Sequence, residues 1–311
     1  MRARVFSITL CVLTILLVIF GVRGMYTAIL PSGSSIDTVL RLASYAAENH
    51  PSTMAAQYFA ELVNQQTLGR IRIQVVSGGE LGSDSAAMEQ LGFGGIAFAI
   101  VNTLSMEDGM ITEGAGGILA PDSAALNMER VDMLCGFVPD YRCIANSYGL
   151  IAFDAQCVGV NIGANSAPIL SDRLGDLGFN VLPYTGADVV SSVHYGYLDG
   201  MELPLMVYAT EEYAKTLPYL SLYRGPAAAD VLLCSQVSMG SLSAEDQRII
   251  RACAEETAAY QASIMGGEQT RAVANLKGKG VKFYPPEMAN LPSSDWDLFG
   301  GRFIGGGLTN E

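Results

Sequence analysis

Helical and strand patterns alternate at short intervals in the first third of this chain, and this alternation constrains the fold more than any other feature. In YFAELVNQQTLGRIRIQVVSGGELG (58–82), apolar residues at helical spacing stop at Gly69, and RIRIQVV then alternates with period two, as a half-buried strand does. The same patterns predict strands at 38–46, 70–76 and 95–101, a helix at 51–66 and a short helix capped by Ser83 or Asp84. This order predicts an α/β fold on a parallel, doubly wound sheet, with the nearly all-apolar third strand at its centre.

The rest of the chain continues the mixed pattern. The predicted elements are two strands in close succession within 148–164, a helix at 166–178 ended by glycine, a strand at 179–184, a helix at 186–200, a short helix at 211–217 and a last strand within 276–286. The strongest helical pattern begins at Ser243, which forms a capping-box pattern with Asp246, and its apolar residues recur at helical spacing as far as Ile264.

The N-terminus has the pattern of an export segment. Arg2 and Arg4 precede an apolar run from Val5 to Val22, which is the order of a basic region and a hydrophobic region in a signal peptide. No A-x-A cleavage site follows, and the run approaches the length of about 20 residues that a membrane-spanning helix needs. Residues 1–30 are therefore predicted to be either a cleaved signal peptide or a retained membrane anchor of an exported protein.

Charge and cysteine spacing exclude several classes of protein. The chain has 18 basic and 31 acidic residues, a formal charge of −13, and nucleic-acid binders need clustered cations instead. Five cysteines follow the export segment without any C-x-x-C pair, which argues against zinc and thioredoxin-type sites: Cys135, Cys143, Cys157, Cys234 and Cys253. Disulfides within 135–157 and buried free thiols both remain open for an exported chain.

The chain has few residues suited to catalysis. His50 and His194 have no second histidine four residues away, and no G-x-S-x-G motif is present. Asp199 and Glu202 form an acidic pair, but a turn aspartate before glycine and a structural glutamate explain them more simply. The sequence predicts no catalytic residues, no metal and no cofactor. It favours a binding protein whose small-molecule solute lies in a cleft between two lobes.

Several motifs in order resemble one family. ENHPSTMAAQYFAELVNQQTLGRIRIQVVSGGELGSDSAAMEQLGFGGIAF (48–98) resembles the start of the DctP-like solute receptors of TRAP (tripartite ATP-independent periplasmic) transporters. LGFNVLPYTGADVVSSVHYGYLDGMELP (177–204) resembles the second hallmark of that family, and YAKTLPYLSLYRG and SLSAEDQRIIRACAEETAAYQ resemble its closing segments. The likeness extends over residues 38–285.

The resemblance implies a two-lobed periplasmic-binding-protein-like fold, braced by the long helix after Ser243. Lobe I would comprise 36–155 plus 229–267, and lobe II 156–228 plus 268–311. Such receptors are not enzymes; they close on a small organic acid and deliver it to the subunits of a membrane permease. The chain would then be periplasmic or an extracytoplasmic protein anchored in the membrane. The ligand-binding residues expected from the resemblance and from aromatic positions at strand ends are Tyr45, Asn102, Gly163, Tyr184 and Glu202.

One departure from the family affects the ligand. The family usually reads G-L-K-I-R where this chain reads GVNIG (159–163), so Gly163 replaces the arginine that ordinarily grips the ligand carboxylate with two hydrogen bonds. We therefore expect an altered carboxylate grip, with a less acidic ligand or with the anion met by another group such as Arg142. The alternative function is a membrane-tethered ligand-sensing or scaffold protein that is not coupled to transport.

Overall fold

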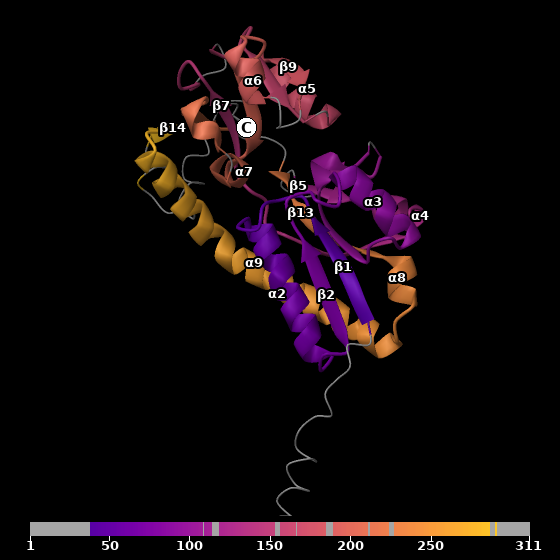
Figure 1. Cartoon of the computed structure of the whole chain (residues 1–311). Helices are drawn as coiled ribbons and strands as arrows, with labels where there is room; N and C mark the ends of the chain where they lie inside the picture. Colours follow the sequence, from indigo (N-terminus) through magenta and orange to yellow (C-terminus); the bar gives the residue numbers. More distant parts are fainter. Residues whose placement is uncertain are drawn as a thin grey trace, which may run out of the picture.

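The computed structural model describes residues 38–107, 109–113, 118–152, 156–165, 167–184, 189–210, 212–223, 227–286 and 290. They form two lobes, each built on a β-sheet with helices around it, and one long helix runs along both lobes (Figure 1). The predicted signal peptide or anchor at 1–30 lies outside these ranges. Within them, no helix combines the length and the apolar character needed to cross a bilayer.

The first lobe contains a five-stranded sheet in the order β2–β1–β3–β13–β6. Its strands are β1 (Thr38–Ser44), β2 (Ile71–Val76), β3 (Phe98–Asn102), β6 (Val131–Gly136) and β13 (Asp230–Ser235), and its helices are α2 (Pro51–Gln66), α3 (Asp84–Phe93), α4 (Ser123–Met128) and α8 (Gln236–Gly240). The first three strands are parallel and β3 is central, as the sequence predicts. The sheet as a whole is mixed, because β13 returns late in the chain and pairs antiparallel with both β3 and β6.

Local signals in the sequence account for the helices of this lobe. His50 caps α2 by accepting a hydrogen bond from the Ser52 N–H at Nδ1, over 3.2 Å, and Pro51 occupies the first turn. Ser83 caps α3, as one of the two predicted candidates, and Gly94 ends α3 in the left-handed conformation with φ of 80°.

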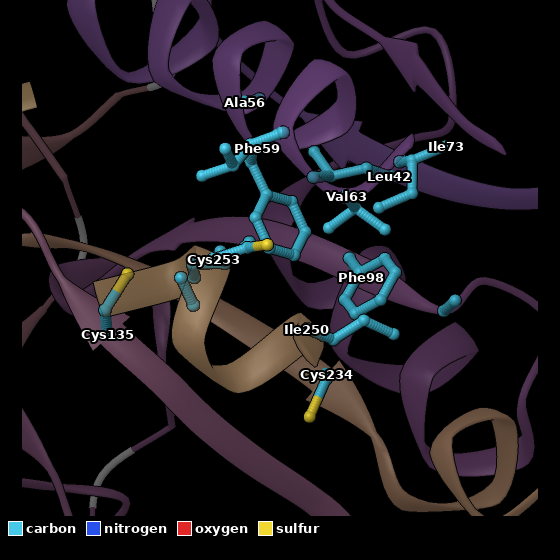
Figure 2. Close-up of a cluster of buried hydrophobic side chains, with 14 of the residues drawn as sticks. Leu42, Ala56, Phe59, Val63, Ile73, Phe98, Cys135, Cys234, Ile250 and Cys253 are labelled. Carbon is cyan, nitrogen blue, oxygen red and sulfur yellow. The ribbon is translucent and has the colours of Figure 1, made fainter. Parts of the chain in front are cut away.

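The core of the first lobe lies between α2, the sheet and the long helix α9 (Ala244–Gly278). Phe59 of α2 meets Phe98 of β3 edge to face, with ring centroids 5.3 Å apart (Figure 2). Ile250 and Cys253 of α9 complete this core from the other side. The apolar stripe of α2 that the sequence shows is thus buried against two partners.

All five cysteines of the described residues are free and buried, so the structure shows the free-thiol alternative. Cys135, Cys234 and Cys253 lie in the core of the first lobe (Figure 2). Burial raises the pKa of the Cys253 thiol to about 11 and the pKa of the other two to about 12. These thiols remain protonated at neutral pH and behave as small apolar side chains.

The second lobe contains a six-stranded sheet in the order β14–β11–β7–β10–β8–β9. Its strands are β7 (Arg142–Asn146), β8 (Asn161–Ala164), β9 (Asn180–Pro183), β10 (Gly200–Pro204), β11 (Tyr219–Leu222) and β14 (Lys282–Tyr284), and its helices are α5 (Pro168–Asp176), α6 (Val189–His194), α7 (Leu205–Thr210) and the 3₁₀ turn η5 (Glu212–Lys215). A small third sheet, β12–β5–β4, consists of β4 (Ile111–Glu113), β5 (Ile118–Pro121) and β12 (Ala227–Ala228), with the 3₁₀ turn η1 (Thr103–Ser105) before it.

The prediction of two strands within 148–164 was wrong for the described residues. That range contains only β8, and the strand that precedes it is β7, at 142–146. All five residues of β7 are buried, including Arg142 and Asn146 at its ends. A short buried strand bounded by polar residues has neither the alternation nor the apolar run that marks strands in a sequence.

Helix α9 joins the two lobes. Ser243 caps it as predicted, accepting the Asp246 N–H over 3.1 Å, and the helix then runs 35 residues to Gly278, beyond the predicted apolar pattern. Ile250 and Cys253 pack in the first core, whereas Val273 and Leu276 pack in the second. In Figure 1, α9 runs beside α2 and reaches the end of the second lobe near β14.

The chain passes between the two large sheets after β6 and again between β11 and β13. The predicted lobe limit at 155/156 falls after β7, although β7 already pairs in the second sheet. The small third sheet combines β4 and β5, which precede the first crossing, with β12, which lies in the second crossing. The exact lobe limits therefore stay a proposal.

Candidate functional site

A cavity of about 450 Å³ lies between the two large sheets, where β1 and β3 end. Its walls come from both lobes: Tyr45, Asp84, Asn102, Leu104, Ser105, Arg142, Asn165, Pro183, Tyr184, Met201, Glu202, Leu203, Pro204, Val207 and Tyr213. A second cavity of about 550 Å³ shares Tyr45, Asp84, Leu104, Ser105 and Asn165 with it and extends to the start of α5. Together they form a cleft with an inner and an outer part.

Four of the five residues expected at the ligand site line the inner cavity, namely Tyr45, Asn102, Tyr184 and Glu202. Gly163 is not among the lining residues, because Tyr184 lies directly over it. A Cβ built on Gly163 would lie 2.9 Å from Tyr184 Cβ and 3.1 Å from Leu198 Cδ1. Gly163 therefore provides the space into which Tyr184 packs. The role of these five residues in binding a ligand stays a proposal.

An ion pair forms one wall of the inner cavity. Arg142 begins β7, and Glu202 lies on the adjacent antiparallel strand β10, diagonally across from it. Arg142 Nε donates to Glu202 Oε1, and Nη2 donates to Oε2 over 2.5 Å. The hydroxyl of Tyr223 donates to Glu202 Oε1 over 2.6 Å. The Arg142 and Glu202 side chains are 7% and 0% exposed, so the carboxylate is held by three donors almost without water.

The charge state of Arg142 follows from these contacts. Burial lowers its pKa, but the charge and hydrogen bonds of Glu202, followed by Tyr223, raise the pKa above the usual value for arginine. The guanidinium thus stays protonated. Arg142 is the one lysine or arginine among the described residues that line the inner cavity. The sequence named Arg142 as an alternative anion-binding group without placing it, and the strand register of β7 and β10 places it in the cavity wall.

A second carboxylate, that of Asp230, holds the side chains of the cavity wall in the first lobe. Asp230 begins β13, pairs with Asn102 of β3 and accepts three hydrogen bonds: from Tyr45 Oη over 3.1 Å, from Asn102 Nδ2 over 2.8 Å and from Ser52 Oγ over 2.5 Å. Asn102 Oδ1 in turn accepts the Leu104 N–H over 3.1 Å. Burial and the charge of Asp230 raise the pKa of Tyr45. Tyr45 and Asn102 are thus held in fixed orientations at the cavity.

Asp84 is the cavity carboxyl that sequence reasoning missed as a site residue. It begins α3, and its Oδ2 accepts the Asn102 N–H over 3.1 Å. Burial raises the pKa of this carboxyl to about 7. The sequence identified Asp84 only as a candidate helix cap. The available signal was its place at the start of a helix that precedes a central strand, where side chains reach the edge of the sheet.

Two aromatic residues form the wall in the second lobe. The Tyr184 hydroxyl is hydrogen-bonded to Ser192 Oγ of α6. Tyr213 is buried and stacks with Tyr208, with an interplanar angle of 20° and centroids 6.2 Å apart. With Tyr45 they offer flat apolar faces with polar edges, which suit the ring or carbon chain of a polar solute.

The acidic pair suggested by the sequence does not form a joint site. Asp199 Oδ2 accepts the Asn161 N–H over 2.8 Å, whereas Glu202 is bound to Arg142. In the part of the chain that the structure describes, no group of three or more His, Cys, Asp and Glu side chains is placed to hold a metal ion.

The model of bacterial extracellular solute-binding protein family 7 (DctP) matches residues 42–109 and 154–293. The chain belongs to this family. As a DctP-family protein, it is an extracellular solute-binding protein. The family match omits residues 110–153, which include β7 and Arg142.

Individual proteins are also similar to this chain in sequence or in fold. The chain is 22% identical over 288 residues to the 2,3-diketo-L-gulonate-binding periplasmic protein of Escherichia coli, covering 86% of each chain. It is 25% identical over 269 residues to an uncharacterized protein of Sinorhizobium fredii. That match covers 77% of this chain but 48% of the relative, so the chain spans about half the length of that protein. Its fold matches a TRAP periplasmic solute-binding protein of Chromohalobacter salexigens with bound D-glucuronate, with a TM-score of 0.71 and 21% identity over 78% of this chain and 87% of the other.

Proposed function

We propose that this DctP-family protein is the receptor of a TRAP-type transporter for a polyhydroxylated organic acid with a single carboxylate. The observation that carries the proposal is the composition of the inner cavity. One guanidinium, that of Arg142, lies with the carboxyl groups of Asp84 and Glu202 among neutral polar side chains and aromatic faces contributed by both lobes. Two relatives support the same ligand class, because one is described as a 2,3-diketo-L-gulonate-binding protein and one holds D-glucuronate.

Each part of such a ligand has a matching group in the cavity. The carboxylate would face Arg142, where a charge-assisted hydrogen bond adds roughly 1.5–3 kcal/mol. Hydroxyl groups would bond to Asp84, Ser105, Asn102 and Asn165, which lie along the cavity. Since polar groups of opposite lobes contact one ligand, binding favours the approach of the lobes.

The remaining steps follow from this role. The closed receptor would deliver its solute to the membrane permease subunits of the transporter, and the chain would act as a carrier rather than an enzyme. We place it outside the cytoplasmic membrane, with residues 1–30 as signal peptide or anchor. Tyr45, Asn102, Tyr184 and Glu202 would contact or shape the ligand, and Gly163 would act through the position of Tyr184.

A melting experiment tests the ligand class. Ligand at one hundred times its dissociation constant stabilises a protein by about 2.7 kcal/mol. For a chain of this size the melting temperature should rise by roughly 2–4 °C. We expect that rise with D-glucuronate or 2,3-diketo-L-gulonate, and no rise with succinate or malate. If neither sugar acid shifts the melting temperature at millimolar concentration, the proposed ligand class is refuted.

The alternative is a membrane-tethered sensing or scaffold protein that is not coupled to transport. The apolar run from Val5 to Val22, without a cleavage site after it, favours this reading. Uptake of labelled sugar acid by cells with and without the chain distinguishes the two functions. Loss of uptake on deletion supports the receptor, whereas unchanged uptake together with ligand binding supports the sensor.

A further inference from the structure

The guanidinium of the cleft already has a carboxylate partner. Glu202 occupies Nε and Nη2 of Arg142 in the parallel, two-bond arrangement that a ligand carboxylate would otherwise take. Both side chains are buried, and Tyr223 holds Glu202 in place from the other side. A ligand carboxylate can therefore reach at most the other N–H groups of Arg142, two on Nη1 and the second on Nη2, unless Glu202 is displaced.

Among the described residues, the two cavities that Arg142 lines contain no other lysine or arginine. The inner cavity is lined by Asp84 and Glu202 as well as Arg142. A small space behind it adds Asp140 and Asp230, with His50. Asp140 accepts hydrogen bonds from the Met206 N–H over 2.6 Å and from Gln269 over 2.8 Å. With Arg142 neutralised by Glu202, the described part of the cleft carries a negative rather than a positive balance.

We propose that Glu202 is a specificity-determining residue, an internal carboxylate that neutralises Arg142 and so limits the ligand to no more than one carboxylate. This inference rests on the proposed function and specifies which acids the site takes. A second ligand carboxylate would lose its hydration beside Asp84 and Glu202 without gaining a cation. Rejection by an unpaired buried charge is a strong source of selectivity.

The Arg142–Glu202 pair does more than stabilise the fold, because it faces the cavity. Arg142 and Glu202 both line the cavity, so the state of the pair sets the charge that a ligand meets. Arg142 also lies within 110–153, the stretch that the family match leaves out. The selectivity is thus inferred from the β7–β10 register and the contacts of this chain.

The test uses Glu202→Gln, which keeps the shape and a hydrogen-bond acceptor but removes the charge. Glu89→Gln is the matched control, because Glu89 is exposed on α3 and its replacement changes the net charge equally. The ligands form a series with none, one and two carboxylates: D-glucose, D-glucuronate and D-glucarate. Calorimetric titration of the purified full-length chain measures the affinity of each.

We expect Glu202→Gln to bind D-glucarate at least about tenfold more tightly than wild type, a change of about 1.4 kcal/mol. The affinity for D-glucose should change little, and Glu89→Gln should behave as wild type. The inference is overturned if folded Glu202→Gln gains no affinity for D-glucarate, or if Glu89→Gln gains as much.

A double variant covers the case in which Glu202→Gln does not fold. Arg142→Gln with Glu202→Gln removes both charges, so D-glucarate should still be rejected; stronger D-glucarate binding than in wild type overturns the inference. Failure of the proposed function is a separate result. If wild type binds no sugar acid, the ligand class fails, whereas the role of Glu202 is judged by the gain in D-glucarate binding between wild type and Glu202→Gln.

Discussion

Tyr184 lies so close to Gly163 that a Cβ on Gly163 would approach Tyr184 Cβ to 2.9 Å. Gly163 stands on β8, where its strand neighbours are Leu182 of β9 and Met201 of β10. The absence of a side chain at Gly163 thus allows the aromatic side chain of Tyr184 to cover the position. Tyr184 occupies the space above Gly163, so a larger side chain at position 163 would have to displace it.

An arginine at position 163 should therefore destabilise the protein. We expect Gly163→Arg to lower the free energy of unfolding by roughly 1–3 kcal/mol, because overpacking forces neighbours out of place. The variant should gain no succinate binding. Adding Tyr184→Ala should recover part of the lost stability by clearing the space. Urea denaturation measures all three proteins, and a stability of Gly163→Arg equal to wild type contradicts the expected clash.

The Arg142–Glu202 pair makes a separate prediction about stability. Arg142→Met leaves the Glu202 carboxylate buried without its cation, which typically costs about 3–5 kcal/mol. Arg142→Met combined with Glu202→Leu removes both charges and should cost less than the single change. Denaturation curves at pH 7 test this order. A double variant less stable than Arg142→Met would show that the pair is not the source of the effect.

Asp84 should make stability depend on pH. Burial raises the pKa of its carboxyl from 3.8 to about 7, so the folded state keeps the proton to a higher pH than the unfolded state. The contribution of Asp84 to stability is therefore fully present below about pH 4 and is lost as pH rises through about 7. The groups that bear on it are Ser105 and Asn102, which lower the pKa, and Asp230, which raises it.

Asp84→Asn should remove this dependence. Since one pKa unit corresponds to about 1.4 kcal/mol, the variant should exceed wild type in stability by on the order of a few kcal/mol at pH 8. The difference should shrink as pH falls toward 4. Denaturation at several pH values checks the trend, and a difference that is constant across pH would refute the assignment.

A glycine in the middle of α9 offers a stabilising change. Gly267 is exposed, and a Cβ built on it meets no atom within 4 Å. Gly267→Ala should raise the unfolding free energy by up to about 1 kcal/mol, because glycine is a poor helix former. Gly278→Ala, also unobstructed but at the last residue of the helix, is the control and should have a smaller effect. Equal gains at both positions would argue against a helix-propensity effect.

The parts of the fold that were predictable from sequence depend on local signals. The bounds of α2 follow from His50, Pro51 and Gly69, and the caps at Ser83 and Ser243 lie where their sequence patterns indicate. Each signal acts over a few residues, so its outcome does not depend on the rest of the chain. The parallel pairing of the first three strands follows for the same reason, since each is joined to the next through a helix.

The parts that were not predictable depend on distant pairings. Arg142 and Glu202 are separated by 60 positions, and only the β7–β10 register brings their side chains together. Asp230 reaches Tyr45 and Asn102 because β13 inserts antiparallel beside β3, an outcome that no local pattern encodes. The contact of Tyr184 with Gly163 likewise requires that β8 and β9 be adjacent.

Helix α9 has a thermodynamic consequence for the whole molecule. Its backbone hydrogen bonds run without interruption from Ile250, in the first core, to Leu276, in the second. Because helix formation is cooperative, disorder that begins in one core removes support from the helix segment that packs in the other. We therefore expect the two lobes to unfold together rather than in succession. A calorimetric scan should show one transition whose van't Hoff and calorimetric enthalpies agree.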